Sequence, residues 1–177
     1  METEFEAKIL DINPDSIKEK IISMGGKHIA DRDMRRFVYD FTPIEPNSWI
    51  RLRYDGLKAQ LTIKEIQHKG ITGTKELEVD VADFDTMNEI LQRLGYKPRS
   101  YQENRRESYE LDGVAIEIDY WPKINPYIEI EASSEADVIK IAEKLGYKES
   151  DLNHDNTDDL YKSNGIDLNT ISELKFN

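Results

Sequence analysis

The sequence predicts an α+β fold in which an antiparallel sheet forms a closed or nearly closed barrel with helices packed outside it. The main observation is that the strand-like stretches alternate charged and apolar residues, so each strand has one charged and one apolar face. In addition, three helix-like stretches each have an apolar face suited to covering a sheet. Finally, Asp55-Gly56 and Asp112-Gly113 are typical of the tight turns that join antiparallel strands.

The alternation begins in Glu4–Lys8, where Glu4, Glu6 and Lys8 share one face. It recurs in later stretches, some with acidic and some with cationic partners: Arg51–Arg53, Thr62–Lys64, Glu76–Asp80, Ile116–Asp119 and Ile128–Glu131. Strands are therefore expected over residues 2–10, 27–41 (one long strand or two short ones), 49–54, 57–67, 74–81, 97–111, 114–121 and 127–132.

Helices are expected over residues 13–24, 83–94 and 134–145, ended by Gly25-Gly26, Gly95 and Gly146 respectively. The first opens at Asn13-Pro14, because proline suits the first turn of a helix. Apolar faces are assigned to the first two helices: Ile17, Ile21, Ile22 and Met24, then Phe84, Met87, Ile90, Leu91 and Leu94. From Ser150 the chain is polar and acidic, and a short helix near Asp158–Ser163 with a loose tail is expected there.

The sequence also contains an internal repeat. Three times a Glu-x-Glu strand is followed by an apolar-faced helix and a glycine, in Glu4–Gly25, Glu76–Gly95 and Glu129–Gly146. After the first two copies comes a similar strand, Arg35–Phe41 and Arg105–Leu111. Two sheet-and-helix halves facing each other would follow from this repeat, and chance similarity within ordinary α+β patterning is the alternative.

Length and composition limit the possible functions. With 177 residues, the chain is expected to form one domain, with a core in residues 1–147 and a polar segment in residues 148–177. Its net charge of -12 argues against a nucleic-acid binder, which needs Lys and Arg to neutralise phosphates. The absence of cysteine excludes disulfides and thiolate sites. We see no signal peptide or membrane span, so a cytoplasmic monomer or homodimer is expected.

Helices packed outside the barrel would turn the charged faces of the strands inward, around a polar cavity. Crowded carboxylates oppose one another's ionisation unless cations neutralise them. Part of that need is met by Lys8, Arg51, Arg53, Lys58, Lys64 and Arg105, and a divalent metal would meet the rest. Because Mg²⁺ and Mn²⁺ prefer oxygen ligands and arginine grips phosphate oxygens, such an interior fits a metal-bound polyphosphate. The alternative is a set of cross-strand salt bridges on an exposed sheet.

The ordered series of charged motifs, beginning with Glu4–Lys8, resembles the signature of the CYTH family, the triphosphate tunnel metalloenzymes. It continues through Arg51–Arg53, Thr62–Lys64, Glu76/Glu78, Arg105-Arg106, Glu117–Asp119 and Glu129–Glu131, and covers about residues 1–147. The resemblance implies an eight-stranded antiparallel tunnel that is open at both ends. One mild departure is Ala132-Ser133, which stands where many relatives have glycine after the last Glu-x-Glu.

The resemblance also implies roles for individual residues. Glu129 and Glu131, with Asp119, would bind a first metal that orients the triphosphate. Glu4 and Glu6, with Glu131 shared, would bind a second metal that activates the attacking group. Phosphates would be held by a cationic set of Lys8, Arg51, Arg53, Lys64 and one of Arg105 or Arg106. The residues expected to act in catalysis are Glu4, Glu6, Lys8 and Lys64, and the remaining tunnel carboxylates are Glu76, Glu78 and Glu117.

The sequence leaves the reaction open. With water as nucleophile, the protein would be a phosphohydrolase that cleaves a phosphoanhydride bond of a triphosphate. With a ribose 3′-hydroxyl as nucleophile, it would be a class IV adenylyl cyclase. A polyphosphate-binding module without activity is a more remote alternative. Other chemistries find no support, since Gly25-Gly26-Lys27 lacks the spacing of a phosphate-binding loop and His28, His68 and His154 are far apart.

Overall fold

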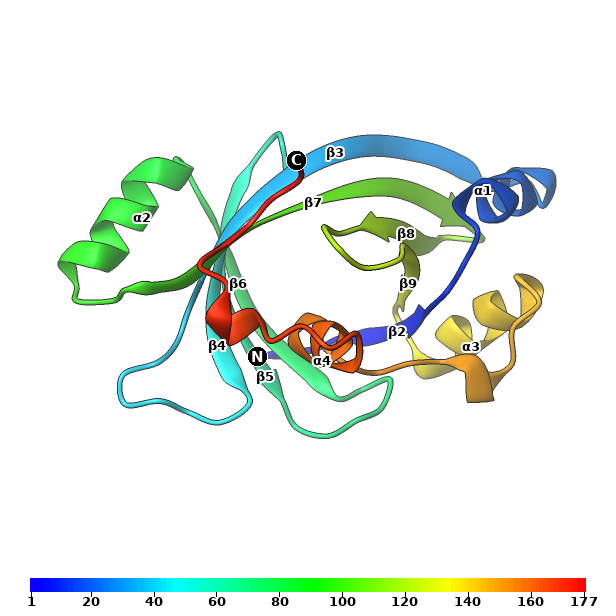
Figure 1. Ribbon diagram of the computed structural model, residues 1–177. Helices are drawn as coiled ribbons and strands as arrows, with labels where there is room; N and C mark the ends of the chain where they lie inside the picture. Colours follow the sequence, from blue (N-terminus) through cyan, green and yellow to red (C-terminus); the bar gives the residue numbers. More distant parts are fainter.

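The computed structural model describes residues 1–177, which form a nearly closed antiparallel barrel with helices outside it (Figure 1). The strands are β1 (Glu2–Thr3), β2 (Phe5–Ile9), β3 (Lys27–Tyr39), β4 (Ser48–Tyr54), β5 (Ala59–Ile66), β6 (Thr74–Val81), β7 (Pro98–Leu111), β8 (Val114–Tyr120), β9 (Tyr127–Ala132) and β10 (Glu173–Leu174). Along the sheet their order is β1-β6-β5-β4-β3-β7-β8-β9-β2. Because β1 and β2 are separated only by Glu4, the two ends of this path meet.

The expected count of eight strands is wrong, since the structure has ten. The N-terminal stretch divides at Glu4 because its two parts pair with different neighbours, β1 with β6 and β2 with β9. The Glu4 amide donates to the Thr74 carbonyl at 3.0 Å. The additional strand β10 pairs in parallel with β7, outside the main path. The stretch 27–41, left open as one strand or two, contains one long strand that ends at Tyr39 and has irregularities in its pairing.

Both predicted hairpins are present, β4 with β5 and β7 with β8. In the second, Asp112 and Gly113 both have positive φ, 56° and 79°. Two central residues with positive φ twist the chain in the direction that the flanking strands require. The register then sets charged residues of neighbouring strands directly opposite each other, including Lys8 with Glu129 and Lys64 with Glu76.

The largest core lies between the outer face of β2, β8 and β9 and the helices α1 (Pro14–Ser23) and α3 (Glu135–Lys144). It contains 17 buried residues, among them Ile116, Ile130 and Val138, which are 0% exposed. Each such aliphatic side chain contributes about 1.5–3 kcal/mol when fully buried. Asn13 caps α1 by accepting the Ser16 amide at 3.0 Å, and Ser134 caps α3 in the same way.

A second core lies under α2 (Phe84–Arg93), which packs on β4. Of the apolar faces assigned to α1 and α2, only part is buried. Ile17, Ile21, Phe84 and Leu91 are inside, whereas four others are exposed: Ile22, Met24, Ile90 and Leu94. The physical reason is that a helix lying on a curved barrel touches it along one narrow stripe. None of the helices is long and apolar enough to cross a membrane.

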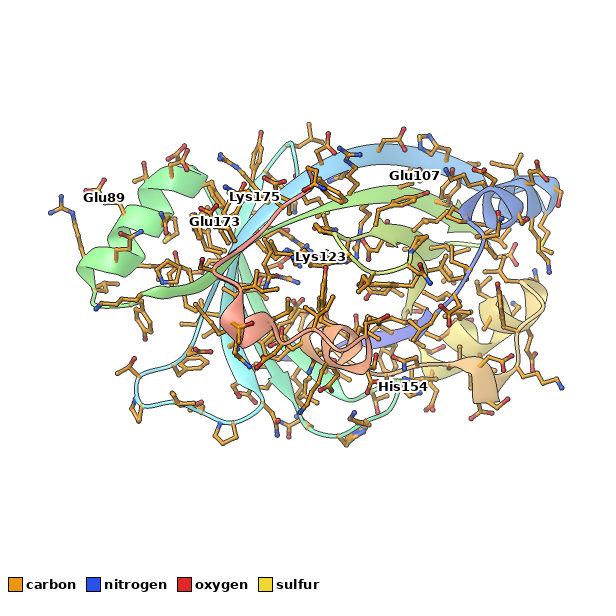
Figure 2. All side chains as sticks on the ribbon, in the orientation of Figure 1. Glu89, Glu107, Lys123, His154, Glu173 and Lys175 are labelled. Atoms are coloured by element: carbon orange, nitrogen blue, oxygen red, sulfur yellow. The ribbon has the colours of Figure 1, made fainter.

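The C-terminal segment is ordered, and the expectation of a loose tail is wrong. It contains η1 (Glu149–Asp151), α4 (Thr157–Ser163, the expected short helix), η2 (Leu168–Thr170) and β10. Leu160, Leu168 and Leu174 pack against Trp121 and Tyr127 in a third core. In Figure 1 the segment crosses in front of the barrel on its way to β7, and Figure 2 shows Glu173 beside Lys175, a pair 2.9 Å apart.

Candidate active site

Two cavities enter the barrel from opposite ends and meet inside it. One has a volume of about 520 Å³ and the other about 490 Å³. Strand β3 lines the first with Arg36 and the second with Arg32. Both cavities share Arg53, Glu78, Arg106 and Glu131 as lining residues. The barrel therefore encloses a charged tunnel that is open at both ends.

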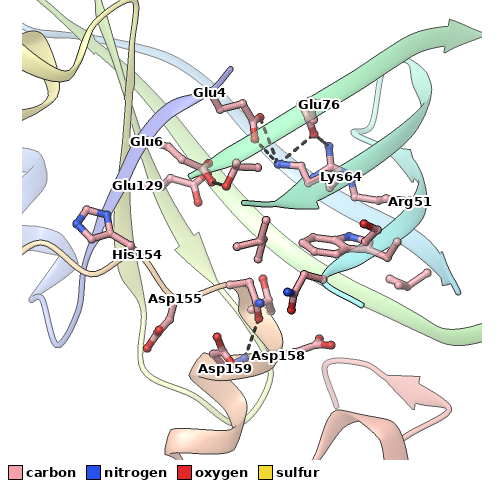
Figure 3. Close-up of a pocket in the computed structure, with 18 of the residues that line it drawn as sticks. Glu4, Glu6, Arg51, Lys64, Glu76, Glu129, His154, Asp155, Asp158 and Asp159 are labelled. Atoms are coloured by element: carbon pink, nitrogen blue, oxygen red, sulfur yellow. Dashed lines mark hydrogen bonds and ion pairs between the residues drawn. The ribbon is translucent and has the colours of Figure 1, made fainter. Parts of the chain in front are cut away.

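One cluster of charges in the tunnel is centred on Lys64 of β5 (Figure 3). Its Nζ lies 2.9 Å from Glu4 and 3.0 Å from Glu76, and Arg51 reaches Glu76 at 2.8 Å. Burial raises the pKa of Glu4 to about 8 despite the attraction of Lys64, with Glu6 and Glu76 adding repulsion. For Glu76 burial is outweighed by Lys64 and Arg51, which lower its pKa to about 2. Two cations therefore hold Glu76 ionised, whereas burial disfavours the charged form of its neighbour Glu4 despite the contact with Lys64.

A second cluster joins β2, β7, β8 and β9. Arg106 donates two hydrogen bonds to Asp119, at 2.8 and 2.5 Å, and also contacts Glu129 at 3.1 Å. Lys8 approaches Glu129 at 2.9 Å from the opposite side. Burial would raise the pKa of Glu129, but Lys8 and Arg106 together hold it well below its usual range. Glu129 is thus held ionised by two cations, and Asp119 is paired with Arg106.

Three other inward carboxylates, those of Glu6, Glu117 and Glu131, form no ion pair. Glu6 and Glu131 stand directly opposite each other on β2 and β9, an arrangement that destabilises a sheet when both are charged. Glu131 remains accessible to solvent, but enclosure by the barrel, followed by the charges of Glu129 and Glu6, raises its pKa. The pKa of Glu117 is also raised, mainly by burial. These three carboxylates therefore have no cation in direct contact, although Arg106 and Lys64 lie near enough to attract Glu131.

The donor set of this wall fits a hard divalent cation, because carboxylate oxygens are the ligands that Mg²⁺ and Mn²⁺ prefer. Of the five residues expected to bind metal, Glu6 and Glu131 have no competing cation. The other three, Glu4, Asp119 and Glu129, are held by Lys64, Arg106 and Lys8. No three carboxylate or histidine side chains form a ready-made metal site, so binding an ion there requires some of these ion pairs to open.

The cationic side of the tunnel lies on β4, where Arg51 and Arg53 both point inward. Arg53 donates to Gln60 at 3.0 Å and reaches Glu78 only at 3.7 Å. Repulsion from Arg51, together with burial, lowers the pKa of Arg53 to about 10. Glu76 and Glu78 both line the tunnel. The two arginines thus provide positive charge that the neighbouring carboxylates only partly balance.

Of the adjacent pair on β7, Arg106 faces the tunnel and Arg105 does not. The Arg105 side chain is 61% exposed, pairs with Asp33 at 3.1 Å and lies over the ring of Phe176. Of the two residues that the sequence left open as a phosphate ligand, Arg105 is therefore the one outside the tunnel. By strand alternation it shares a face with Glu103 and Glu107. That face is the outer one, where Glu107 pairs with Lys18 of α1.

Several residues of the tunnel were missed in the sequence. Arg36 on β3 is buried and faces inward beside Gln102 of β7. The alternation on β3 is obscured because its inward positions mix charged and apolar residues: Arg32, Met34, Arg36 and Val38. The stretch His154–Asp159 lies at the mouth of the larger cavity (Figure 3), which Trp49 also lines. No sequence signal could place that stretch, because it is brought there by packing of the C-terminal segment.

The protein is a nearly closed antiparallel barrel whose tunnel is lined by carboxylates, arginines and lysines. These features define its class, the β-barrels with a charged tunnel. The match to a family model is consistent with this class. The model of the CYTH domain matches residues 2–163, and the chain therefore belongs to the CYTH family, whose enzymes are metal-dependent. The match extends beyond residue 147, the limit inferred from motifs, and includes α4.

Solved structures resemble the chain over most of its length. The PH1012 protein from Pyrococcus horikoshii OT3 is 27% identical, with a TM-score of 0.76 over 89% of this chain and 98% of that one. A candidate adenylate cyclase from Vibrio parahaemolyticus has a TM-score of 0.77 at 13% identity, covering 91% and 98%. A candidate adenylyl cyclase from Hippeastrum, described with a dominant triphosphatase activity, has a TM-score of 0.65 at 14% identity, covering 94% and 97%. These last two likenesses establish the fold alone. No curated protein sequence matches the chain.

Proposed function

We propose that the protein is a metal-dependent triphosphate-processing enzyme, and specifically a phosphohydrolase that cleaves a phosphoanhydride bond of inorganic or organic triphosphates. The observation that carries this proposal is the pairing of two opposed walls in one tunnel. Glu6 and Glu131 lack cationic partners on one side, and Arg51 and Arg53 crowd together on the other. A polyphosphate bound together with a divalent cation complements both walls at once.

In this proposal Glu6 and Glu131 are the first carboxylates to take Mg²⁺ or Mn²⁺, and Glu4, Asp119 and Glu129 complete a two-metal set. Such ions supply neutralisation of phosphate charge and a more acidic attacking water. If these carboxylates held metal, Lys8 and Lys64 would lose their present partners Glu129 and Glu4 and become available to phosphate oxygens. Internal ion pairs would then be replaced by contacts with the bound triphosphate.

The phosphate chain would be held by Lys8, Arg51, Arg53, Lys64 and Arg106, all of which line the larger cavity. Arginine provides planar, two-pronged hydrogen bonding to phosphate oxygens, and lysine provides a compact charge. Lys8 and Lys64, which contact Glu129 and Glu4 at 2.9 Å, would stabilise the charge that develops as the anhydride bond breaks. Fixing the chain in line with the attacking water is the main catalytic contribution of these residues.

A class IV adenylyl cyclase is the second candidate, and one feature of the mouth favours it. Trp49 lines the cavity beyond Arg51 on the same strand, where it offers an aromatic surface to an organic group. A cyclase needs base and sugar contacts that direct the 3′-oxygen at the α-phosphorus. We rank hydrolysis first because the residues inside the tunnel address phosphate and metal, and an inorganic triphosphate uses them all.

The deciding experiment offers tripolyphosphate and ATP separately to the protein with Mg²⁺ or Mn²⁺. The products are followed by phosphate release and chromatography. We expect tripolyphosphate to be hydrolysed to orthophosphate and pyrophosphate faster than ATP is consumed. Formation of cyclic AMP and pyrophosphate from ATP, with tripolyphosphate left intact, would establish the cyclase instead. Tight binding of tripolyphosphate without turnover of either substrate would indicate a polyphosphate-binding module.

A further inference from the structure

Arg36 differs from every other cation inside the tunnel. Lys8, Lys64, Arg51 and Arg106 each have a carboxylate within 3.1 Å, and Arg53 has one at 3.7 Å. Arg36 has none within 4 Å, although it is only 8% exposed. Its guanidinium therefore carries a buried charge without an ionic partner.

The contacts that Arg36 does make are neutral. One of its terminal nitrogens donates to the Asn104 side-chain oxygen, and its guanidinium lies 4.6 Å from the centre of the Trp121 ring. The nearest acid in this chain of contacts is Asp119, which Asn104 reaches at 3.2 Å but which Arg106 already binds with two hydrogen bonds. The Nε of Arg36 has no partner. These contacts hold the side chain in place and leave part of its hydrogen-bonding capacity free.

The neighbours of Arg36 add to the unbalanced charge. Its cross-strand partner on β4 is Arg53, and like charges at such positions destabilise a sheet. Burial, followed by repulsion from Arg51 and Arg53, lowers the pKa of Arg36 well below its usual value. Removing a charge from water without a counter-ion is costly for the free protein. An anion bound between Arg36 and Arg53 would remove this cost.

The position of Arg36 in the barrel indicates which anion this is. Strand β3 is four strands away from the N-terminal strand along the sheet in either direction, through β6, β5 and β4 or through β9, β8 and β7. Arg36 therefore faces Glu6 and the other carboxylates of the N-terminal side across the tunnel. A phosphate chain in the tunnel has oxygens turned toward those carboxylates and their metal, and oxygens turned the opposite way. If the only positive charge came from the metal, the phosphate oxygens that point away from the carboxylates would have no cation near them.

We propose that Arg36 is an additional substrate-binding residue, which together with Arg53 binds the phosphate oxygens that point away from the carboxylate side of the tunnel. This inference rests on the proposed function, since it concerns the same triphosphate. The alternative is a purely structural role, in which Arg36 holds the barrel together through its hydrogen bond to Asn104 and does not contact the substrate.

The test measures binding in the absence of turnover. The probe is the imido-linked analogue of tripolyphosphate, with Mg²⁺, titrated by calorimetry into the wild type, Arg36→Gln and Arg35→Gln. Arg35 is the matched control because it lies next in the same strand with its guanidinium on the outer face, over Phe84. We expect Arg36→Gln to weaken binding at least tenfold and Arg35→Gln to change it less than twofold. The melting temperature of free Arg36→Gln should equal or exceed that of the wild type, because a buried unpaired charge is removed.

A purely structural role predicts the reverse, a lower melting temperature and unchanged affinity, and that result would overturn the inference. If the wild type itself did not bind the analogue, both the inference and the proposed function would fall. If the wild type bound it and Arg36→Gln bound it equally well, only the inference would fall. Arg36→Lys provides a second variant that keeps the charge, so it is expected to fold. Loss of the planar fork should weaken its binding about threefold, and unchanged affinity in this variant also counts against the inference.

Discussion

The inner and outer faces of the barrel carry similar charged residues in different environments. Inside, Arg106 is 17% exposed and its partner Asp119 only 1%, and two hydrogen bonds join them. Outside, the next residue Arg105 is 61% exposed and pairs with Asp33, which is 87% exposed. Water screens the outer pair, whereas the inner pair is protected from it. The comparison shows that the contribution of a charged strand residue to stability depends on whether its side chain lies on the inner or the outer face of the barrel.

The largest difference is expected when the arginine is removed from the inner pair, Arg106–Asp119, and from the outer pair, Arg105–Asp33, and the free energies of unfolding are compared. Arg106→Gln leaves the buried Asp119 without its two charge-assisted hydrogen bonds, and should lower the free energy of unfolding by about 3–5 kcal/mol. Arg105→Gln should change it by less than about 0.5 kcal/mol. Urea denaturation of both variants measures the difference. Equal losses would show that the inner pair is as well solvated as the outer one.

The second contrast concerns carboxylates and activity. Glu131→Ala should lower kcat with tripolyphosphate about a hundredfold while the protein remains folded, because Glu131 faces Glu6 and is proposed to serve both metals. Glu143→Ala, on the solvent side of α3, is the control and should retain full activity. The wild type should also lose activity in excess chelator. Full turnover by folded Glu131→Ala, or by wild type in chelator, would refute the assignment of this wall.

A smaller effect is expected on the cationic side. Lys64→Ala and Arg53→Ala should each lower kcat/KM for tripolyphosphate at least tenfold, about 1.4 kcal/mol, since each loses a charge-assisted contact. Lys140→Ala on α3, an exposed position, should have almost no effect. Lys18 on α1 is less suitable as a control, because it pairs with Glu107 at 2.7 Å. Similar kinetics for inner and outer variants would remove the support for phosphate binding inside the tunnel.

The smallest effect concerns Asp55 at the turn between β4 and β5. Burial would raise the pKa of Asp55, but the Lys58 and Leu57 amides, with Arg32, lower it below its usual value. A lowered pKa contributes stability that is present above the unfolded pKa and lost as pH falls through the folded one. Asp55→Asn should therefore cost about 1 kcal/mol at pH 7. This cost should disappear in strong acid, which thermal unfolding at both pH values would show.

Alternation, turn residues and caps determined most of the barrel from the sequence. These signals are local, because each depends on a few neighbouring residues. They are the alternation of charged and apolar residues in the strands, the glycines that end the helices and the two Asp-Gly turns. Glu4, Glu6, Lys8, Lys64, Glu129 and Glu131 were found in this way, and all of them line the tunnel. Their roles in binding metal and phosphate stay predictions until the variants above are measured.

The tertiary structure alone decided what depends on partners distant in sequence. Parity grouped Arg105 with Glu103 and Glu107, but only the packing of α1 on that face made it the outer one. The N-terminal strand divides at Glu4 because it pairs with both β6 and β9. The polar C-terminal segment lies at a mouth of the tunnel because Leu160 and Tyr161 are buried beside Trp121. Arg36 lacks a carboxylate partner because its neighbours across the sheet are Arg53 of β4 and Gln102 of β7. The order of the strands in the barrel sets these neighbours, and the residues next to Arg36 along the chain do not.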